Sequence, residues 1–199
     1  PTPRVVREKY QARAQAQLRK LLTLLPDGVV LEYAGAIEWV KGEESLAVWA
    51  GPSMNIFNSE AEKEIERLGF SGCFLSQELT IPQIRHIAKG SDIPLGAYVY
   101  GRTEMMISEY CAINAVMGDK DKKHCPMYCM RGHFALKDGE GRRFPIHTDE
   151  WCHMHIANCH VLDMRPYFDE LKKAGLSAVT LDVRGYEGSI LSLCKDACD

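Results

Sequence analysis

Short apolar segments that alternate with helical segments restrict the fold of this chain more than any other feature of its sequence. Four segments are apolar and rich in β-branched or aromatic residues: VVLEYA (29–34), LAVWA (46–50), GCFLS (72–76) and LGAYVY (95–100). Such segments are typical of buried strands. Helices are predicted between the later strands, because Ser59 with Glu62 and Thr80 with Gln83 have the spacing of a capping box. Strands that alternate with helices predict a parallel sheet with helices packed against it.

The same alternation returns near the C-terminus, where a helix is predicted over 163–173 and a strand over 178–183. Five strands of this type suit either a doubly wound sheet or part of a (β/α)₈ barrel. No GxGxxG motif follows the first strand, which argues against the dinucleotide-binding version of the doubly wound sheet. A complete barrel needs eight strands in about 250 residues. The prediction is therefore an α/β fold that forms the latter part of a TIM-type (β/α) barrel.

Two regions divide the chain. An amphipathic helix is predicted within residues 1–27, because apolar residues recur at helical spacing until Pro26 and Gly28 stop them. The barrel portion is predicted over 28–199. Because the chain begins with Pro1 rather than Met, we interpret it as an excised domain or a processed product.

Residues 101–160 interrupt the alternation and are predicted to be an insertion. The segment 108–134 is rich in cysteine and fits neither a helix period nor a strand period. It is followed by HFALKDGEGRRFPIH, which predicts a β-hairpin that turns at 138–141. The insertion begins at the C-terminal end of a predicted strand, and folds of this class place their active sites at that end. We therefore expect the functional site in the insertion.

Cysteine is unusually clustered in the insertion. The eight cysteines are at positions 73, 111, 125, 129, 152, 159, 194 and 198. Cys111, Cys125 and Cys129, together with Cys152, could place four thiolates around one centre, which suits a [4Fe–4S] cluster or a structural zinc ion. Soft sulfur ligands do not distinguish these two, and a disulfide knot or simply buried thiols are the alternatives. Cys73 stands alone in a predicted strand and is expected to be a small buried side chain.

Histidine is also clustered, in the stretch that follows the hairpin. Four of the seven histidines lie there: His147, His153, His155 and His160. With Cys152 and Cys159 they could form a mixed zinc site, and polar histidines of a loop are the alternative. A zinc-peptidase helix is not expected, because the sequence contains no HExxH motif.

Charged side chains near the insertion supply further candidates. A general acid or base could be among five carboxylates: Glu78, Glu104, Glu109, Asp149 and Glu150. Most carboxylates of this kind are solvated or cap helices. Arg102 and Arg131 flank the cysteine segment and are candidate anchors for a carboxylate or phosphate group, with an ordinary salt bridge as the alternative.

The charge and hydropathy of the chain exclude some classes of protein. A formal net charge of −3 provides no strong field to attract nucleic acid or an anionic membrane. No apolar run approaches the roughly 18 residues that a membrane span requires, and no signal peptide opens the chain. We therefore expect a cytoplasmic protein, in which clustered cysteines favour metal or redox chemistry over disulfides.

Several separate segments resemble, in order, those of the collagenase-like peptidase family U32. They lie within residues 46–184 and are NIFNSEA, FLSQELT, GAYVYGRTEMMISEYC, CPMYC and FALKDGEGRRFPIHTDEWC. The resemblance implies a TIM-type barrel. It also implies a [4Fe–4S] cluster, with zinc as the alternative, bound by four cysteines: Cys111, Cys125, Cys129 and Cys152.

The resemblance further implies an activity. Some members of the family take part in oxygen-independent hydroxylation of RNA bases or of quinone precursors, and others are called collagenases or proteases. We therefore expect an iron–sulfur enzyme, part of a larger protein, that acts on an RNA base or a small aromatic. A peptidase and a zinc-stapled non-catalytic module are the alternatives. The candidate substrate-binding residues are Arg102, Arg131, His133 and Glu78. The remainder of the same polypeptide or a second copy is expected to cover the open edges of the partial barrel.

Overall fold

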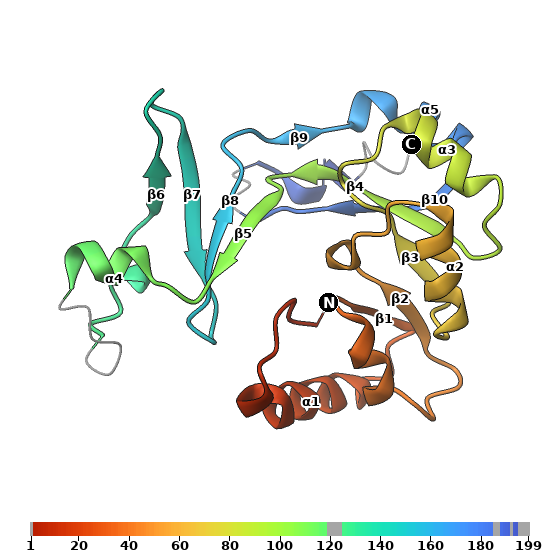
Figure 1. The fold of residues 1–199 in the computed structure, drawn as a ribbon, viewed down its shortest axis with the longest axis horizontal. Coiled ribbons are helices and arrows are strands. Elements are labelled where there is room, and N and C mark those ends of the chain that lie inside the picture. Colours follow the sequence, from red (N-terminus) through yellow and green to blue (C-terminus); the bar gives the residue numbers. More distant parts are fainter. Residues whose placement is uncertain (1, 119–124, 185–187, 192, 195–199) are drawn as a thin grey trace. The chain divides into compact units, whose positions relative to one another are not determined.

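The computed structural model describes residues 2–118, 125–184, 188–191 and 193–194, which fall into two compact units (Figure 1). The first unit contains the residues up to Val99, the segment 164–181 and the described residues after 187. The second contains residues 100–163 and 182–184, and so includes the predicted insertion 101–160. Each unit is described by itself below.

The first unit is built on a sheet of the five strands that the sequence predicts. They are β1 (Gly28–Leu31), β2 (Ala47–Ala50), β3 (Gly72–Phe74), β4 (Leu95–Gly101) and β10 (Leu176–Leu181), and they lie in that order. The pairs β1–β2, β2–β3 and β3–β4 are parallel, which confirms the predicted α/β class. Strands β1 and β10 end this path, so the described strands form an open sheet, and the TIM-type barrel remains a prediction.

Helices connect these strands. The α-helices of the first unit are α1 (Glu8–Leu22), α2 (Ser59–Arg67), α3 (Ile81–Ala88) and α5 (Phe168–Lys173); the 3₁₀ helices are η1 (Ala34–Trp39), η2 (Pro52–Met54) and η5 (Arg165–Tyr167). Within the described residues, no helix combines the length and the apolar composition that crossing a bilayer requires.

The two predicted capping boxes had different outcomes. The backbone N–H of Thr80 donates to Gln83 Oε1 at 2.8 Å, as the capping-box prediction requires. The prediction for Ser59 with Glu62 is wrong, because α2 begins one residue earlier: Asn58 is the cap and accepts from the backbone N–H of Ala61 at 2.8 Å. Asparagine caps a helix as well as serine does. The Glu62 side chain does not form a capping box and is buried instead.

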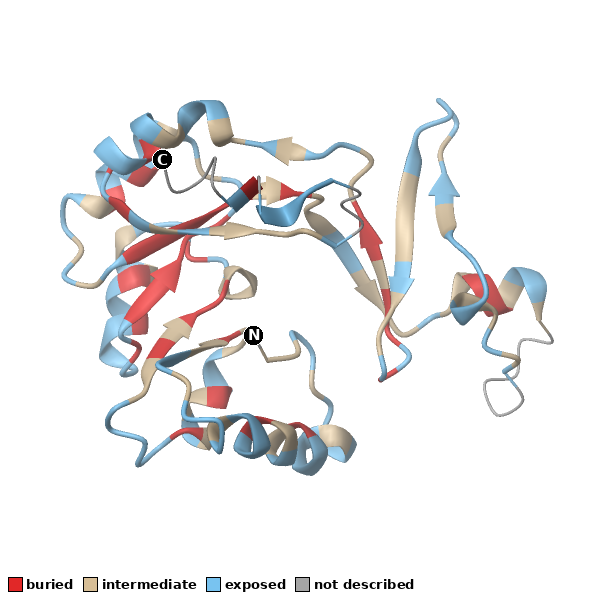
Figure 2. Cartoon of the chain, turned by 180° about the vertical axis from the view of Figure 1, so that it is seen from behind, coloured by how far each residue is buried: buried red, intermediate tan, exposed pale blue. Residues whose placement is uncertain are grey.

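Apolar side chains of the helices and strands share one core. Ile65 of α2, Ile84 of α3 and Leu171 of α5 belong to the same buried cluster as Leu75 and Leu95 from the sheet. Figure 2 shows this burial concentrated along the strands and on one side of each helix. Burial of these apolar faces is the main force that holds the helices onto the sheet.

Two glycines of the sheet are covered by aromatic rings of the neighbouring strand. Trp49 pairs with Gly72 and Phe74 pairs with Gly96 in the parallel register. A Cβ atom on Gly96 would lie 2.6 Å from two ring carbons of Phe74, and one on Gly72 would lie 2.5 Å from the Trp49 ring. The two rings contact each other, with centroids 5.3 Å apart. Glycine at these positions therefore makes room for the aromatic pair.

Cys73 is predicted to be the least reactive of the described thiols. It is fully buried, as expected from the sequence, and burial together with the nearby charge of Glu62 raises its pKa to about 12. A thiol reacts as the thiolate, so we expect iodoacetamide to label the exposed Cys125 and Cys152 of the reduced, metal-free protein long before Cys73. Mass spectrometry of the peptides measures this, with urea-unfolded protein as the control in which all three react. Equal labelling of Cys73 and Cys152 in the native protein would contradict the buried position.

The second unit is built on a separate antiparallel sheet. Its strands are β5 (Glu104–Ser108), β6 (Phe134–Lys137), β7 (Arg143–Thr148) and β8 (Met154–Ala157), in the order β5-β8-β7-β6. The predicted hairpin is β6–β7, and the backbone N–H of Gly141 donates to the carbonyl of Asp138 within its turn. Strands β6, β7 and β8 are consecutive neighbours in this sheet, and β5, which precedes them in the chain, lies beside β8. This arrangement is a Greek key. The short strand β9 (Leu162–Asp163) pairs with the end of β4.

Candidate functional site

The four predicted cysteine ligands lie at one end of the antiparallel sheet. In the order β5-β8-β7-β6, the ends of β5 and β7 and the starts of β6 and β8 all face the same way, because neighbouring strands are antiparallel. Cys111, Cys125 and Cys129 lie in the connection from β5 to β6, and Cys152 lies in the connection from β7 to β8. The connection from β5 to β6 joins the two edge strands, which are about 14 Å apart at the usual strand spacing. Because β8 and β7 lie between them, this connection passes the turn that carries Cys152.

Two short helices hold Cys111 and Cys129 in the longer connection. Helix α4 (Ala112–Met117) begins at Cys111, whose Sγ accepts from the backbone N–H of Asn114 at 3.4 Å. The 3₁₀ helix η4 (Tyr128–Met130) contains Cys129 and contacts α4. The sequence analysis predicted neither helix, because each is too short to show a period.

Cys152 sits in a tight turn between β7 and β8. Its φ of 59° lies in the left-handed region, which is uncommon for a residue with a side chain. Its backbone N–H donates to the carbonyl of Asp149 at 3.2 Å, and its side chain is exposed. The turn therefore presents the thiol to the surface at the cysteine-rich end of the sheet.

All cysteines in the described residues are free thiols, so the disulfide knot is not formed there. Nor do three sulfurs gather within 4.8 Å of one another in this part of the chain. A zinc ion with Zn–S bonds of about 2.3 Å holds its four sulfurs about 3.8 Å apart. The thiols thus share one end of the sheet without forming a ready-made site for a single ion.

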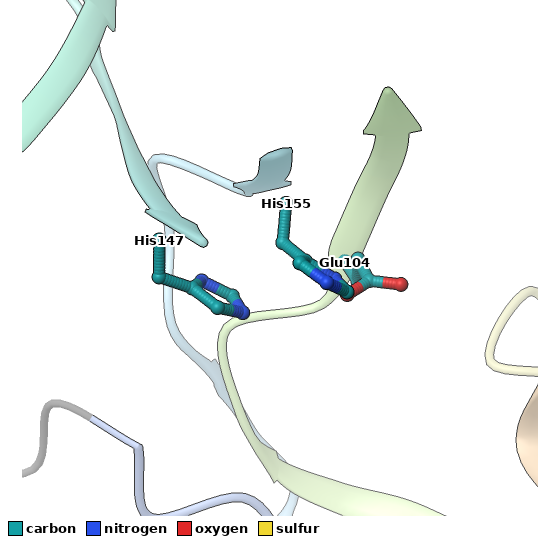
Figure 3. A group of neighbouring side chains, drawn as sticks. All are labelled: Glu104, His147 and His155. Atoms are coloured by element: carbon teal, nitrogen blue, oxygen red, sulfur yellow. The ribbon is translucent and has the colours of Figure 1, made fainter. Parts of the chain in front are cut away.

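A second group of functional side chains lies on the strands of the same sheet. His147 of β7 and His155 of β8 are directly opposite in the register, and their rings stack with centroids 4.7 Å apart and an angle of 11° between planes. Glu104 of β5 joins them, with its Oε2 atom 2.5 Å from Nδ1 of His155 (Figure 3). One ligand atom from each of the three lies within 4.8 Å of the others, and no other such group occurs among the described residues.

Asp149 supports this group from the β7–β8 turn. Its Oδ1 atom accepts from the backbone N–H groups of Trp151 and His153, at 2.9 and 2.8 Å. Its Oδ2 atom lies 2.9 Å from Nδ1 of His153 and 3.3 Å from Nε2 of His155. A carboxylate held by four contacts has little freedom to rotate, so Asp149 fixes the orientation of the His155 ring.

The electrostatic environment shifts the pKa values of the two stacked histidines in opposite directions. The hydrogen bond with Glu104 raises the pKa of His155 above its ordinary value. Burial lowers the pKa of His147, and the positive charges of His155 and Arg184 lower it further. Burial alone would raise the pKa of Asp149, but its hydrogen bonds from His153 and His155 outweigh that effect and lower it. The pKa values of the two stacked rings are therefore shifted in opposite directions, and His147 loses its proton more readily than His155.

The mixed cysteine–histidine zinc site is not formed. The structure instead groups two of the four histidines, His147 and His155, with Glu104. A local sequence pattern could not predict that Glu104 lies beside them in the sheet. His153 is buried, with Nε2 3.7 Å from Glu109 Oε1, and His160 is exposed.

The candidate substrate anchors have different surroundings. Nη1 of Arg102 donates to the carbonyls of Asn158 and Cys159, at 3.0 and 2.5 Å, so this nitrogen fixes a turn. The other three anchors are exposed: Arg131, His133 and Glu78. The first two follow Cys129 closely, whereas Glu78 belongs to the first unit.

The fold and the site define a parallel α/β protein whose inserted antiparallel sheet carries four free thiols at one end. The chain belongs to peptidase family U32: the model of that family matches residues 4–192. This confirms the resemblance seen in the sequence. No curated protein and no solved structure matches the chain.

Proposed function

We propose that the chain is the cluster-bearing part of an iron–sulfur enzyme that takes part in oxygen-independent hydroxylation of an RNA base or a small aromatic. The observation that carries the proposal is the position of Cys111, Cys125, Cys129 and Cys152 at one end of the antiparallel sheet, all as free thiols. A cubane cluster binds each thiolate through a different iron, so its ligands stand further apart than those of a single ion. Four thiols that share an end without touching suit the larger centre.

The chain's own residues would have three tasks in this function. The four cysteines hold the [4Fe–4S] cluster, which would supply electrons rather than bind substrate, because protein thiolates would occupy all of its irons. Arg131 and His133, exposed beside Cys129, are placed to bind substrate, and a guanidinium suits a carboxylate or phosphate group. Arg102 supports the insertion by holding two backbone carbonyls.

A partner is also expected for the open sheet of the first unit. Among the described residues no further strand lies beside β1 or β10, although the backbone N–H of Thr2 donates to the Val30 carbonyl on the outer edge of β1 at 3.0 Å. Exposed edges pair readily with other strands. We expect the remainder of the polypeptide or a second copy to cover them.

Anaerobic reconstitution with iron and sulfide tests the proposed cluster. We expect about four irons and four sulfides per chain, together with the broad visible absorption of a cubane cluster. Zinc as the only metal of anaerobically isolated protein, with no uptake of iron and sulfide, would favour a zinc-stapled module. Exposure to air should bleach the absorption and release iron.

Membership in a peptidase family is equally compatible with hydrolysis of peptides. A gelatin-type peptide incubated with the protein, with divalent metals added back, measures this activity. Cleavage that persists in a variant without the four cysteines would favour the peptidase over the iron–sulfur enzyme.

A further inference from the structure

We propose that Glu104, His147 and His155 bind one divalent first-row transition-metal ion at a site separate from the four cysteines. The three ligand atoms already lie within 4.8 Å of one another. A tetrahedral ion with bonds of about 2.1 Å holds its ligands about 3.4 Å apart. The three donors reach that spacing when the side chains rotate, which includes unstacking the nearly parallel His147 and His155 rings and opening the 2.5 Å contact between Glu104 and His155.

The backbone holds the three donors in place before any ion arrives. Each donor comes from a different strand of one sheet, and His147 and His155 are opposite each other in adjacent strands. An irregularity in β5 between Glu104 and Met106 shifts the register there by one residue. Such bulges re-aim side chains and are common beside functional sites. Sites built on strands are more rigid than sites built on loops.

The hydrogen bonds of His155 are compatible with a bound cation. Both ring nitrogens of His155 face carboxylate oxygens, Nδ1 toward Glu104 and Nε2 toward Asp149. A neutral imidazole has one N–H and can donate to only one of the two carboxylates, whereas a protonated ring donates to both; a metal ion would take the place of the second proton. An ion bound to Glu104 and to Nδ1 leaves the Nε2–H group for Asp149. A histidine that donates from its second nitrogen to a carboxylate is the usual arrangement around a protein-bound metal.

The remaining neighbours are compatible with a bound ion. Arg184 Nη1 lies 3.3 Å from His147 Nε2, and the same guanidinium is paired with the carboxylate of Asp182. If an ion binds Nε2 of His147, the carboxylate of Asp182 still neutralises the charge of Arg184. Figure 3 shows the His147 and His155 rings side by side, with Glu104 beside His155.

The donor set selects the class of metal. Two imidazoles and one carboxylate suit Zn²⁺ or Fe²⁺, whereas Mg²⁺ and Ca²⁺ prefer oxygen ligands alone. Three protein ligands leave at least one coordination position for water or another small ligand. The site differs from the cysteine-rich end in its ligand chemistry, so the two centres are distinguishable by spectroscopy.

Titration of Co²⁺ into the reduced 199-residue chain tests the proposal. The first sample replaces Cys111, Cys125, Cys129 and Cys152 by serine, which removes the competing thiolates. Co²⁺ bound by thiolate gives an intense near-ultraviolet charge-transfer band, whereas nitrogen and oxygen ligands give only weak visible bands. We expect one equivalent of Co²⁺ with the weak bands alone. No binding, or several equivalents that bind equally weakly, would overturn the proposal.

Variants of the donors locate the bound ion. In the same background, which lacks the four proposed cluster cysteines, His147→Ala and Glu104→Gln should each weaken Zn²⁺ binding at least about tenfold, measured by competition with a chromophoric chelator. The matched controls His160→Ala and Glu140→Gln, both exposed in the same unit, should leave the affinity unchanged. Circular dichroism checks that each variant is folded. An unchanged affinity in both donor variants would show that the metal binds elsewhere.

X-ray absorption of the zinc-loaded chain without the four proposed cluster cysteines provides a second measurement that needs no donor variant. We expect scattering from two imidazole rings and from oxygen ligands. Fewer than two imidazoles would overturn the proposal. The outcome is independent of the iron–sulfur function, because the four proposed cluster ligands are absent from this sample.

Discussion

The double variant Cys125→Ala/Cys129→Ala is expected to lose the iron–sulfur cluster completely. Anaerobic reconstitution should give less than one iron per chain in place of about four, with no broad visible absorption. Two of the four proposed ligands disappear together, and the remaining two thiols belong to different connections of the sheet. Iron and sulfide analysis, alongside the absorption spectrum, measures the loss.

The matched control for this variant is Cys159→Ala. Cys159 is a free, half-buried thiol of the same unit, and only its backbone carbonyl contacts Arg102. We expect the control to take up as much iron as the parent chain. The single replacements Cys111→Ala and Cys152→Ala then test the ligands that come from each end of the insertion. A double variant that keeps the parent's iron and sulfide content would refute the proposed ligand set.

Replacing Gly96 with alanine is expected to lower the free energy of unfolding by about 1–3 kcal/mol. The new methyl group would lie 2.6 Å from two ring carbons of Phe74 and 3.3 Å from Cβ of Ala178. The Phe74 ring is buried and rests against Trp49, so relief of this contact requires the aromatic pair to shift. The midpoint of urea unfolding, with the slope held in common, measures the change.

Gly90→Ala is the matched control, because nothing lies within 4 Å of the Cβ position at Gly90. Its effect on stability should stay within about 0.5 kcal/mol, as for surface substitutions generally. A double-mutant cycle sharpens the test: Phe74→Leu should make the Gly96→Ala change less costly, because the two side chains compete for one space. Equal effects at Gly90 and Gly96 would show that the ring moves away freely.

The sequence predicts most of the first unit correctly, because its strands and helices are continuous and carry their own signals. Each of the five strands begins within two residues of the apolar segment that predicts it. The Asn58 cap was missed because serine and asparagine are adjacent there and both are good caps. Small displacements of this kind leave the architecture unchanged.

The second unit was harder to predict, for two physical reasons. Strand β5 contains an irregularity beside two exposed methionines, Met105 and Met106, so it lacks the alternation of a regular strand. Its pairing with β8 joins residues about 50 positions apart, as in the contact of Glu104 with His155. A local pattern contains no information on such a pairing. Cysteines and histidines could therefore be named as candidates, but their grouping could not.

The position of Asp149 has a consequence for how these sites can be dissected. Its carboxylate binds the backbone on both sides of Cys152 and also contacts the His155 ring. A substitution of Asp149 would therefore disturb the thiol and the imidazole together, and its phenotype would be uninterpretable for either alone. His147 lies in β7 and is not among the residues that contact the Asp149 side chain. A substitution of His147 therefore tests the group of Glu104, His147 and His155 without disturbing the turn that carries Cys152.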